Sequence, residues 1–257
     1  NYMVRGLNIF KEYFRQYSHN YVIIGGTACD IIIVEAGFTP RTTKDIDIIL
    51  VVEALSSEFV EQFWKFIKTG EYGDREQSIG KRQYYRFRKP KNTDFPYQIE
   101  LFSRIPDVIA MDRKVHLTPI PVDDDLSSLS AILLNDDYYN YVIEHSVEKD
   151  GLKHASIDAL ICLKAKAFLE IMGRIESGSH EDKKQLRKHK TDVFRLTVML
   201  TPDAVFDLPH TIQAHIYQFA DIIANDLPDK AIFKEMGLGN TEPKAVFEQF
   251  KKSFRIS

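Results

Sequence analysis

Cysteine is scarce in this 257-residue sequence, which has only Cys29 and Cys162, and the motifs of zinc enzymes and serine hydrolases are missing. There is no Cys-x-x-Cys, no His-Glu-x-x-His and no Gly-x-Ser-x-Gly, so neither chemistry is indicated. The two cysteines lie far apart in apolar helical segments, which predicts buried thiols rather than a disulfide. The Gly-Lys-Ser/Thr loop and the Gly-x-Gly-x-x-Gly turn of common nucleotide-binding proteins are also absent.

Long apolar runs and a strong excess of one charge are missing as well. No apolar run reaches the roughly 20 residues that span a bilayer, and the N-terminal segment lacks a signal-peptide pattern. We therefore expect a cytoplasmic protein with no membrane contact. The formal net charge of −3 gives no global reason to bind nucleic acid, so such a partner would require a local basic patch. The length allows one large domain or two smaller ones.

The most informative stretch begins with a strand that runs into a helix through two glycines. The apolar segment Tyr21–Ile24 predicts the strand, the turn Gly25-Gly26-Thr27 follows, and Ala28–Ala36 has the pattern of a short helix. Glycines at this position leave bare backbone N–H groups at the helix N-terminus, where the positive end of the helix dipole favours a phosphate.

A second motif follows this helix and places two carboxylates at the start of a buried strand. A basic, hydroxyl-rich turn leads into Asp45-Ile46-Asp47, and the alternation of strand side chains puts both aspartates on one face. Carboxylates together with substrate phosphates are the ligands that Mg²⁺ prefers. Each motif alone is common, because Gly-Gly often simply ends a strand and Asp-x-Asp is often a solvated strand end. Together they are the equipment for phosphoryl or nucleotidyl transfer.

The order and spacing of these motifs resemble the DNA polymerase beta nucleotidyltransferase superfamily and, within it, the AbiEii-like toxin group. The residues that show the resemblance are Gly25-Gly26-Thr27-Ala28 and Arg41-x-Thr43-x-Asp45-x-Asp47. The resemblance implies an α/β (α+β) nucleotidyltransferase fold, in which a mixed sheet flanked by helices is followed by a C-terminal helical domain. It also implies Mg²⁺-dependent transfer of a nucleoside monophosphate from an NTP to an acceptor hydroxyl, with two metal ions and with Mn²⁺ as an alternative ion.

The resemblance also assigns roles to residues of the predicted sheet. A third acid of the superfamily comes from a strand beside the Asp-x-Asp strand, and Glu100 in the predicted strand Tyr97–Phe102 matches best. The expected metal ligands are therefore Asp45, Asp47 and Glu100, all three also expected to be catalytic. The expected nucleotide-binding residues here are Gly25, Gly26, Thr27, Arg41 and Thr43.

Two further residues are implied in the C-terminal part. Lys164, in a long helix expected after Ser156, matches the lysine that contacts nucleotide phosphates in the family, although a mid-helix lysine is usually solvated. Asp192 matches an acid that is catalytic or orients that lysine. The sequence departs from the family pattern around it, because Thr191 replaces a lysine and Arg195 replaces a second aspartate.

The rest of the chain predicts a nucleotidyltransferase domain at 1–155 and a helical domain at 156–257. Helices are expected at Met3–Tyr17 and Ser56–Thr69, the latter with Trp64 in the core. We interpret the basic segment Lys81–Pro90 as an exposed edge strand rather than a nucleic-acid surface. Further expectations, all from local pattern, are a strand at Val115–Thr118, an acidic loop at Asp123–Asp125, a hairpin of Tyr138–Val147 with Lys153–Ser156, and a helix cap at Ser179 with Asp182.

The acceptor remains open at this stage. The AbiEii-like group implies an RNA acceptor, such as the 3′ end of tRNA, and a toxin held in check by an antitoxin protein. A nucleotidyltransferase that modifies a small molecule such as an aminoglycoside is an alternative, as is an inactive nucleotidyltransferase-like binding module. The intact Asp45, Asp47 and Gly25-Gly26 argue against the inactive module. The sequence indicates neither the nucleotide preference nor the oligomeric state.

Overall fold

The structure is a computed structural model that describes residues 4–41, 43–77, 83–104, 118–119, 132–133, 135–178 and 183–257. The chain divides into two compact units. The first unit comprises Asn1–Ile31, Arg41–Leu134 and Ser146–Ala155, and the second comprises Ile32–Pro40, Asn135–His145 and Ser156–Ser257. The predicted acidic loop Asp123–Asp125, the predicted cap at Ser179 with Asp182 and most of the predicted strand Val115–Thr118 lie outside the described residues.

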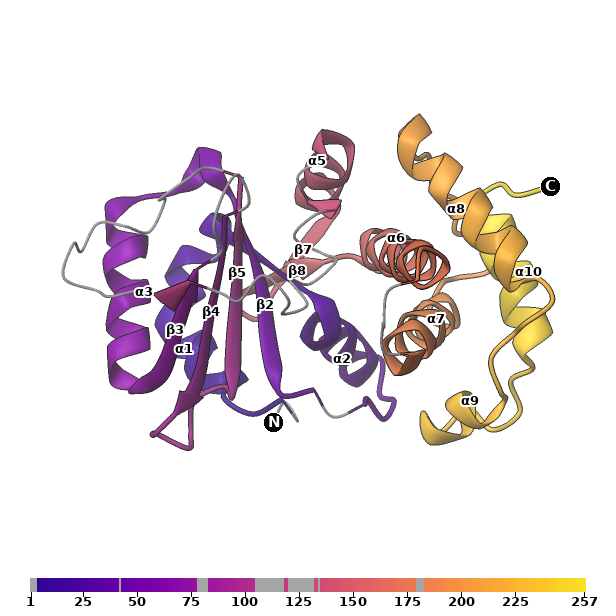
Figure 1. Cartoon of the computed structure of the whole chain (residues 1–257). Coiled ribbons are helices and arrows are strands. Elements are labelled where there is room, and N and C mark those ends of the chain that lie inside the picture. The colour runs from indigo at the N-terminus through magenta and orange to yellow at the C-terminus, as the bar shows by residue number, and fades with distance from the viewer. Residues whose placement is uncertain are drawn as a thin grey trace. The chain divides into compact units, whose positions relative to one another are not determined.

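The first unit is built on a mixed sheet whose described strands run in the order β6-β3-β4-β5-β2-β1-β8-β7 (Figure 1). Their bounds are β1 Tyr21–Ile24, β2 Asp45–Leu50, β3 Tyr72–Gln77, β4 Gln83–Pro90, β5 Gln98–Ser103, β6 Thr118–Pro119, β7 Ser146–Lys149 and β8 Leu152–Ala155. Strand β2 pairs antiparallel with β1 and parallel with β5, and β5 pairs antiparallel with β4. The predicted mixed sheet is therefore confirmed.

Aromatic side chains hold two helices, α1 (Leu7–Phe14) and α3 (Ser57–Thr69), against one face of this sheet. The Phe10 ring lies 5.4 Å from that of Tyr21 in β1, and the Trp64 ring lies 5.8 Å from that of Phe87 in β4. Trp64 is 5% exposed, which confirms its expected place in the core. A short 3₁₀ helix, η1 (Arg15–Asn20), connects α1 to β1, and another, η2 (Val52–Ala54), follows β2.

The interpretation of the basic segment as an exposed edge strand is wrong. Strand β4 lies between β5 and β3, so both of its edges are paired. Its neighbour β3 has the sequence YGDREQ, which lacks the apolar alternation that marks a strand, and its existence could not be inferred from pattern. As a result Arg86, which would be solvated on an edge, is only 7% exposed.

The predicted hairpin is correct at its turn and wrong in its first arm. Strands β7 and β8 pair across Asp150 and Gly151, which have φ angles of 53° and 73°. Residues 138–144, however, belong to helix α5 (Asp136–Glu144). The side chain of Asn135 accepts hydrogen bonds from the backbone N–H groups of Asp137 and Tyr138 and so starts this helix. A cap of this kind outweighs the strand propensity of the tyrosines that follow.

The second unit is helical, as predicted for the C-terminal part. Besides α5, its helices are α6 (Ile157–Glu176), α7 (Lys183–Thr197), α8 (His210–Ile223), α9 (Ala231–Glu235) and α10 (Pro243–Ser253). Phe219 of α8 packs against Phe168 of α6 and Phe250 of α10, with ring centroids 5.2 and 5.9 Å apart. Helix α2 (Gly25–Glu35) begins in the first unit and ends in the second. No helix of the described residues has the length and apolarity to cross a membrane.

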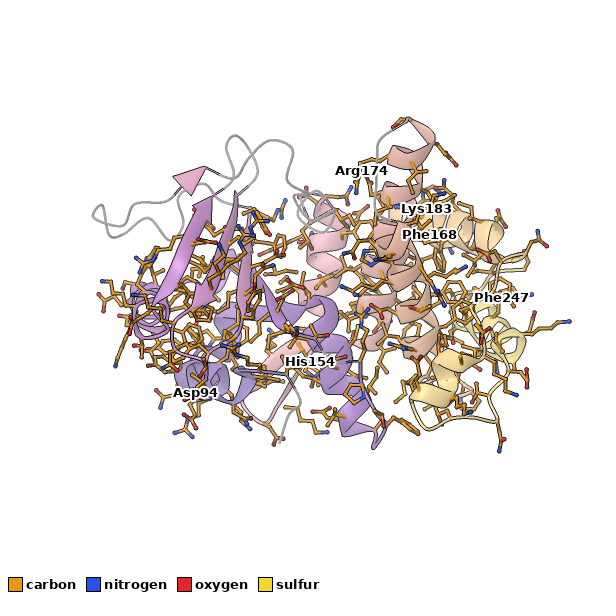
Figure 2. All side chains as sticks on the ribbon, turned by 60° about the horizontal axis from the view of Figure 1, so that its bottom comes forward. Asp94, His154, Phe168, Arg174, Lys183 and Phe247 are labelled. Atoms are coloured by element: carbon orange, nitrogen blue, oxygen red, sulfur yellow. The ribbon has the colours of Figure 1, made fainter. Side chains whose placement is uncertain are left out.

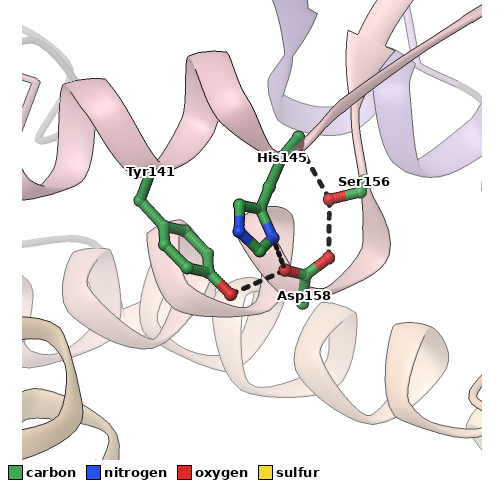
Figure 3. A network of polar contacts seen from close by, with 4 residues as sticks. All are labelled: Tyr141, His145, Ser156 and Asp158. Carbon is green, nitrogen blue, oxygen red and sulfur yellow. Dashed lines mark hydrogen bonds and ion pairs between the residues drawn. The ribbon is translucent and has the colours of Figure 1, made fainter. Parts of the chain in front are cut away.

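A buried carboxylate organises the start of α6 (Figure 3). Asp158 accepts hydrogen bonds from the Tyr141 hydroxyl at 2.7 Å and the Ser156 hydroxyl at 2.6 Å, and lies 2.5 Å from Nδ1 of His145. Ser156 precedes the helix as predicted, but its side chain accepts no backbone hydrogen bond from it. Cys29 and Cys162 are both buried free thiols, which confirms the expectation from the sequence.

Candidate active site

The predicted alternation of the acidic strand is confirmed. In β2, Asp45 and Asp47 are partly exposed while Ile46 and Ile48 are buried, so the two carboxylates share the face opposite the apolar packing. The parallel register pairs Asp47 with Glu100 of β5. Glu100 is therefore on the same face as both aspartates, directly across from one of them, as the resemblance implied.

The environment of Glu100 makes its negative charge costly. The side chain is 9% exposed, and burial, followed by the charge of Asp47, raises its pKa from 4.5 to about 8. The neighbouring hydroxyl of Tyr84 opposes this shift in pKa, and the amide of Gln98 donates to Glu100 Oε1 at 2.8 Å. Two carboxylates held this close favour either a shared proton or a cation between them.

The first glycine of the turn touches the acidic strand directly. Gly25 is the first residue of α2 and has a φ of +70°, a conformation that a residue with a Cβ atom adopts only at a cost. A Cβ atom built on Gly25 would stand 1.9 Å from Oδ2 of Asp47. Only glycine at this position lets the backbone and the carboxylate lie side by side, so the bend and the acidic strand form one site.

The second glycine faces the basic turn. A Cβ atom on Gly26 would stand 2.9 Å from Oγ1 of Thr43 and 3.6 Å from Nη2 of Arg41. The backbone N–H of Thr43 donates to Asp30 Oδ2 at 3.1 Å, which fixes this turn against α2. The Thr43 hydroxyl itself is buried with no hydrogen-bond partner among the described residues. It is an unsatisfied polar group beside a helix N-terminus, where a phosphate oxygen would satisfy it.

Thr27 connects the helix start to the acidic strand. Its side chain is fully buried, and its hydroxyl donates to the backbone carbonyl of Asp45 at 2.5 Å. The hydroxyl is therefore engaged within the protein. Any contribution of Thr27 to phosphate binding is left to its backbone N–H, and the side chain positions Asp45.

The remaining two expected residues form an ion pair in the second unit. Nζ of Lys164 in α6 donates to Oδ2 of Asp192 in α7 at 2.9 Å, and the two residues are 2% and 3% exposed. Arg195, at the position where the sequence departs from the pattern it resembles, pairs with Glu235 at 2.7 Å. The pairing of Lys164 with Asp192 is the geometry expected of an acid that orients a lysine.

The structure thus brings most of the predicted residues together in two groups. The first group surrounds the start of α2 and contains Gly25, Gly26, Thr27, Arg41, Thr43, Asp45, Asp47 and, across from Asp47, Glu100. The second group is Lys164 with Asp192. Over the described part of the chain, no group of three or more His, Cys, Asp and Glu side chains is arranged to hold a metal ion. The metal-binding role of the three acids stays a prediction.

Sequence reasoning missed two residues that line the same face of the sheet. Arg86 of β4 is the register partner of Glu100 and is buried, and Tyr84, two residues earlier, is close enough to influence the pKa of Glu100. The signal was present in the hairpin of Lys81–Pro90 with Tyr97–Phe102. Counting the antiparallel register back from its turn would have placed Arg86 opposite Glu100.

Comparison with known proteins does not assign the chain to a family. No protein-family model and no curated protein matches the chain. One solved structure with a similar fold is the crystal structure of an antigenic nucleotidyltransferase-like protein from Paracoccidioides brasiliensis. The two sequences are 15% identical, and the superposition has a TM-score of 0.41. It covers 89% of this chain and 90% of the chain of that structure. A likeness of this size assigns no family. The class that the structure defines is an α/β protein with a mixed sheet and a helical C-terminal unit.

Proposed function

We propose that the protein is a Mg²⁺-dependent nucleotidyltransferase that moves a nucleoside monophosphate from an NTP to an acceptor hydroxyl. The observation that supports this most is the contact between the two motifs. Gly25 lies against the carboxylate of Asp47, while Gly26 faces Arg41 and Thr43. Groups that bind phosphate and groups that bind its metal ion therefore meet at one helix N-terminus.

The phosphate-binding side of the site consists of the start of α2 and the basic turn. The backbone N–H groups after Gly25 and the hydroxyl of Thr43 donate to phosphate oxygens, and the Arg41 guanidinium neutralises their charge. Backbone donors of this kind are fixed before the nucleotide arrives, so they cost little reorganisation when charge develops on the leaving pyrophosphate.

The acids Asp45, Asp47 and Glu100 would hold Mg²⁺, or Mn²⁺ in its place. The type of donor suits such an ion, because all three side chains are carboxylates and a cation would offset the negative charge whose cost raises the pKa of Glu100, although the three are not arranged as a metal site in the described part of the chain. When bound, the ion supplies charge neutralisation on the triphosphate and lowers the pKa of the attacking hydroxyl.

In the proposed reaction the acceptor hydroxyl oxygen forms a bond to the α-phosphorus. The bond from the α-phosphorus to the oxygen bridging it to the β-phosphorus breaks, and pyrophosphate leaves with that electron pair. The hydroxyl proton passes to a carboxylate of the acid set. Lys164, oriented by Asp192, is proposed to contact the nucleotide phosphates.

The proposed acceptor is RNA, such as the 3′ end of tRNA, and the proposed biological role is that of a toxin neutralised by an antitoxin protein. This finer proposal rests on the resemblance of the glycine and aspartate motifs to AbiEii-like toxins. The basic residues of α7 offer a local patch for RNA in a chain whose formal net charge as a whole is −3. An aminoglycoside-type acceptor and an inactive binding module are the alternatives.

The test is transfer of label from an α-³²P-NTP to total RNA or to a panel of aminoglycosides, in the presence of Mg²⁺. We expect labelled RNA and released pyrophosphate with the wild-type protein, and neither with Asp45→Asn/Asp47→Asn. The matched control is Asp74→Asn, an acid of β3 that pairs with Lys89 at 2.9 Å and should be dispensable.

Each outcome of this assay selects one function. Labelling of an aminoglycoside but not RNA would establish the small-molecule alternative. Absence of transfer from every NTP to every acceptor, by a folded wild-type protein, would favour the binding module. Full activity in the double variant would refute the proposed site.

A further inference from the structure

A cavity in the second unit has no part in the site described above. Its volume is about 400 Å³, which falls within the range of about 300–1,000 Å³ that is usual for small-molecule sites. It is lined by residues of α6, α7 and the end of α8 with the segment that follows. Apolar side chains make up half of the lining, and they are Phe168, Met172, Leu186, Ile222, Leu227 and Pro228.

Three cationic side chains from one face of α7 line the same cavity. Lys183, Arg187 and Lys190 are spaced four and three residues apart, which places them on one side of the helix. Lys183 and Phe168, both labelled in Figure 2, line this cavity, so a cation and part of the apolar lining face the same space. Among the described residues neither the ammonium group of Lys183 nor the guanidinium of Arg187 has a hydrogen bond or ion pair. The cationic edge of the cavity is therefore available to an anion.

Lys190 is the buried member of this set. It is 9% exposed, and its ammonium group donates to the carboxylate and the backbone carbonyl of Asp226 at 2.6 and 2.8 Å. An ammonium group has three N–H donors, so one remains without a partner in the described part of the chain. A buried charge with an unused donor is stabilised by a further anionic ligand.

The cavity also presents hydrogen-bond acceptors. Asp226 and Asp229 line it, and the hydroxyl of Thr191 lies on the same helix face as Lys183 and Arg187. A ligand that fills the cavity thus needs an anionic group, an apolar surface and hydrogen-bond donors. Inorganic phosphate lacks the apolar surface, and an ionised fatty acid has no donors for the two carboxylates.

We propose that this cavity binds a nucleoside monophosphate unit, either as a free nucleotide or as a nucleotide of an RNA chain. The phosphate contacts Lys183, Arg187 and the third N–H of Lys190. The base lies on the apolar lining near Phe168 and Pro228, and amino or ribose hydroxyl groups donate to Asp226 or Asp229. This site is separate in residues from the proposed active site, and the inference does not depend on transferase activity.

The test is calorimetric titration of the full chain with AMP, CMP, UMP, inorganic phosphate and a short single-stranded RNA, in EDTA. Asp45→Asn/Asp47→Asn serves as the background, so that binding near the acidic strand is weakened. We expect Lys183→Ala/Arg187→Ala to weaken nucleotide or RNA binding at least tenfold. The matched control is Lys234→Ala/Lys244→Ala, which removes the same charge from exposed residues of α9 and α10 that do not line the cavity and should change affinity less than twofold.

The arms of the titration identify the source of the ligand. Tighter binding of RNA than of free nucleotide assigns the cavity to an RNA, and the reverse assigns it to a free nucleotide. Equal losses of affinity in the cavity variant and in the control variant would overturn the proposal. Binding of inorganic phosphate as tight as that of AMP would also overturn it. Because transfer activity is measured separately, loss of activity in the aspartate background with retained nucleotide binding here distinguishes the two sites.

Discussion

At the scale of single residues, the buried carboxyl of Glu100 makes stability depend on pH. Its pKa is raised to about 8 in the folded protein, against 4.5 for the ordinary value. Below pH 4.5 the carboxyl group is protonated in both the folded and the unfolded state, so it does not lower the free energy of unfolding. As pH rises from about 4.5 to about 8 the unfolded chain ionises first, so stability is lost across this window, by an amount on the order of a few kcal/mol.

We predict that Glu100→Gln removes this loss. In urea unfolding with EDTA present, the variant should gain stability relative to wild type as pH rises from 5 to 8.5, because glutamine cannot ionise. The control is Glu71→Gln, the same substitution at a surface position. Its free energy of unfolding should follow that of the wild type at every pH. Parallel curves for Glu100→Gln and wild type would contradict the assignment of the raised pKa.

Gly25 provides a second prediction at this scale. Gly25→Ala introduces a methyl group 1.9 Å from Asp47 Oδ2 and also strains a positive φ. Gly37→Ala is the matched control, because its φ is +82° and no atom lies within 4 Å of the added Cβ. Both should destabilise through φ, but Gly25→Ala should cost roughly 1–3 kcal/mol more and abolish transfer activity. Equal free energies of unfolding for the two variants would show that Gly25 and Asp47 are not in contact.

The residue pattern predicted some of the site and could not predict the rest. Alternation alone placed Asp45 and Asp47 on one face, because strand geometry has a strict period of two. The burial of Glu100 could not be predicted, since it depends on β5 being paired on both edges, with β4 and with β2. The hydrogen bond from the Thr27 hydroxyl to the Asp45 carbonyl could not be predicted either, because it joins residues 18 positions apart in the sequence.

At the scale of helices and strands, the ion pair of Lys164 and Asp192 couples α6 to α7. Removing one partner leaves the other charged and buried, so Lys164→Met and Asp192→Leu should each destabilise by about 3–5 kcal/mol. The double variant should cost much less than the sum. A double-mutant cycle by denaturant unfolding measures this coupling.

The exposed pair of Lys91 with Glu71 is the control for that cycle, since their side chains are 78% and 61% exposed. Its coupling should lie between about 0 and 1 kcal/mol. Additive effects at Lys164 and Asp192 would mean that the buried pair is not formed in solution.

A further prediction concerns the junction of α5 and α6. Asp158→Ala leaves the Tyr141 hydroxyl and Nδ1 of His145 without their common partner, so it should destabilise the protein by about 2–4 kcal/mol. Asp221→Ala, an exposed position on α8, should change stability by less than about 0.5 kcal/mol. The measurement is the midpoint of thermal unfolding of the two variants. Similar midpoints for Asp158→Ala and Asp221→Ala would exclude a structural role for the Asp158 network.

The same scale shows which elements were predictable. Helix α3 could be predicted because Ser56 caps it through the N–H of Phe59 and its apolar positions recur at helical spacing. Helix α5 was missed because a run rich in tyrosine favours a strand, and the Asn135 cap that decides the matter was not recognised. Strand β3 was missed because its partners in the sheet, rather than its own side chains, make it a strand.

At the scale of the whole molecule, the chain divides less simply than its sequence suggested. Segments Ile32–Pro40 and Asn135–His145 belong to the helical unit although they lie within the N-terminal 155 residues. The period of the sequence reports local structure only, and the assignment of a segment to a unit depends on packing between distant residues. Thr39, for example, donates its backbone N–H to the carbonyl of Met236.

The central claim is that the glycine turn and the two aspartates hold the same Mg²⁺–triphosphate. The most direct measurement is a crystal structure with a non-hydrolysable NTP and Mn²⁺, located by its anomalous scattering. The account predicts metal bound to Asp45 and Asp47, with the β- and γ-phosphates on the backbone N–H groups at Gly25-Gly26. A nucleotide bound elsewhere, with no metal on either aspartate, would contradict it.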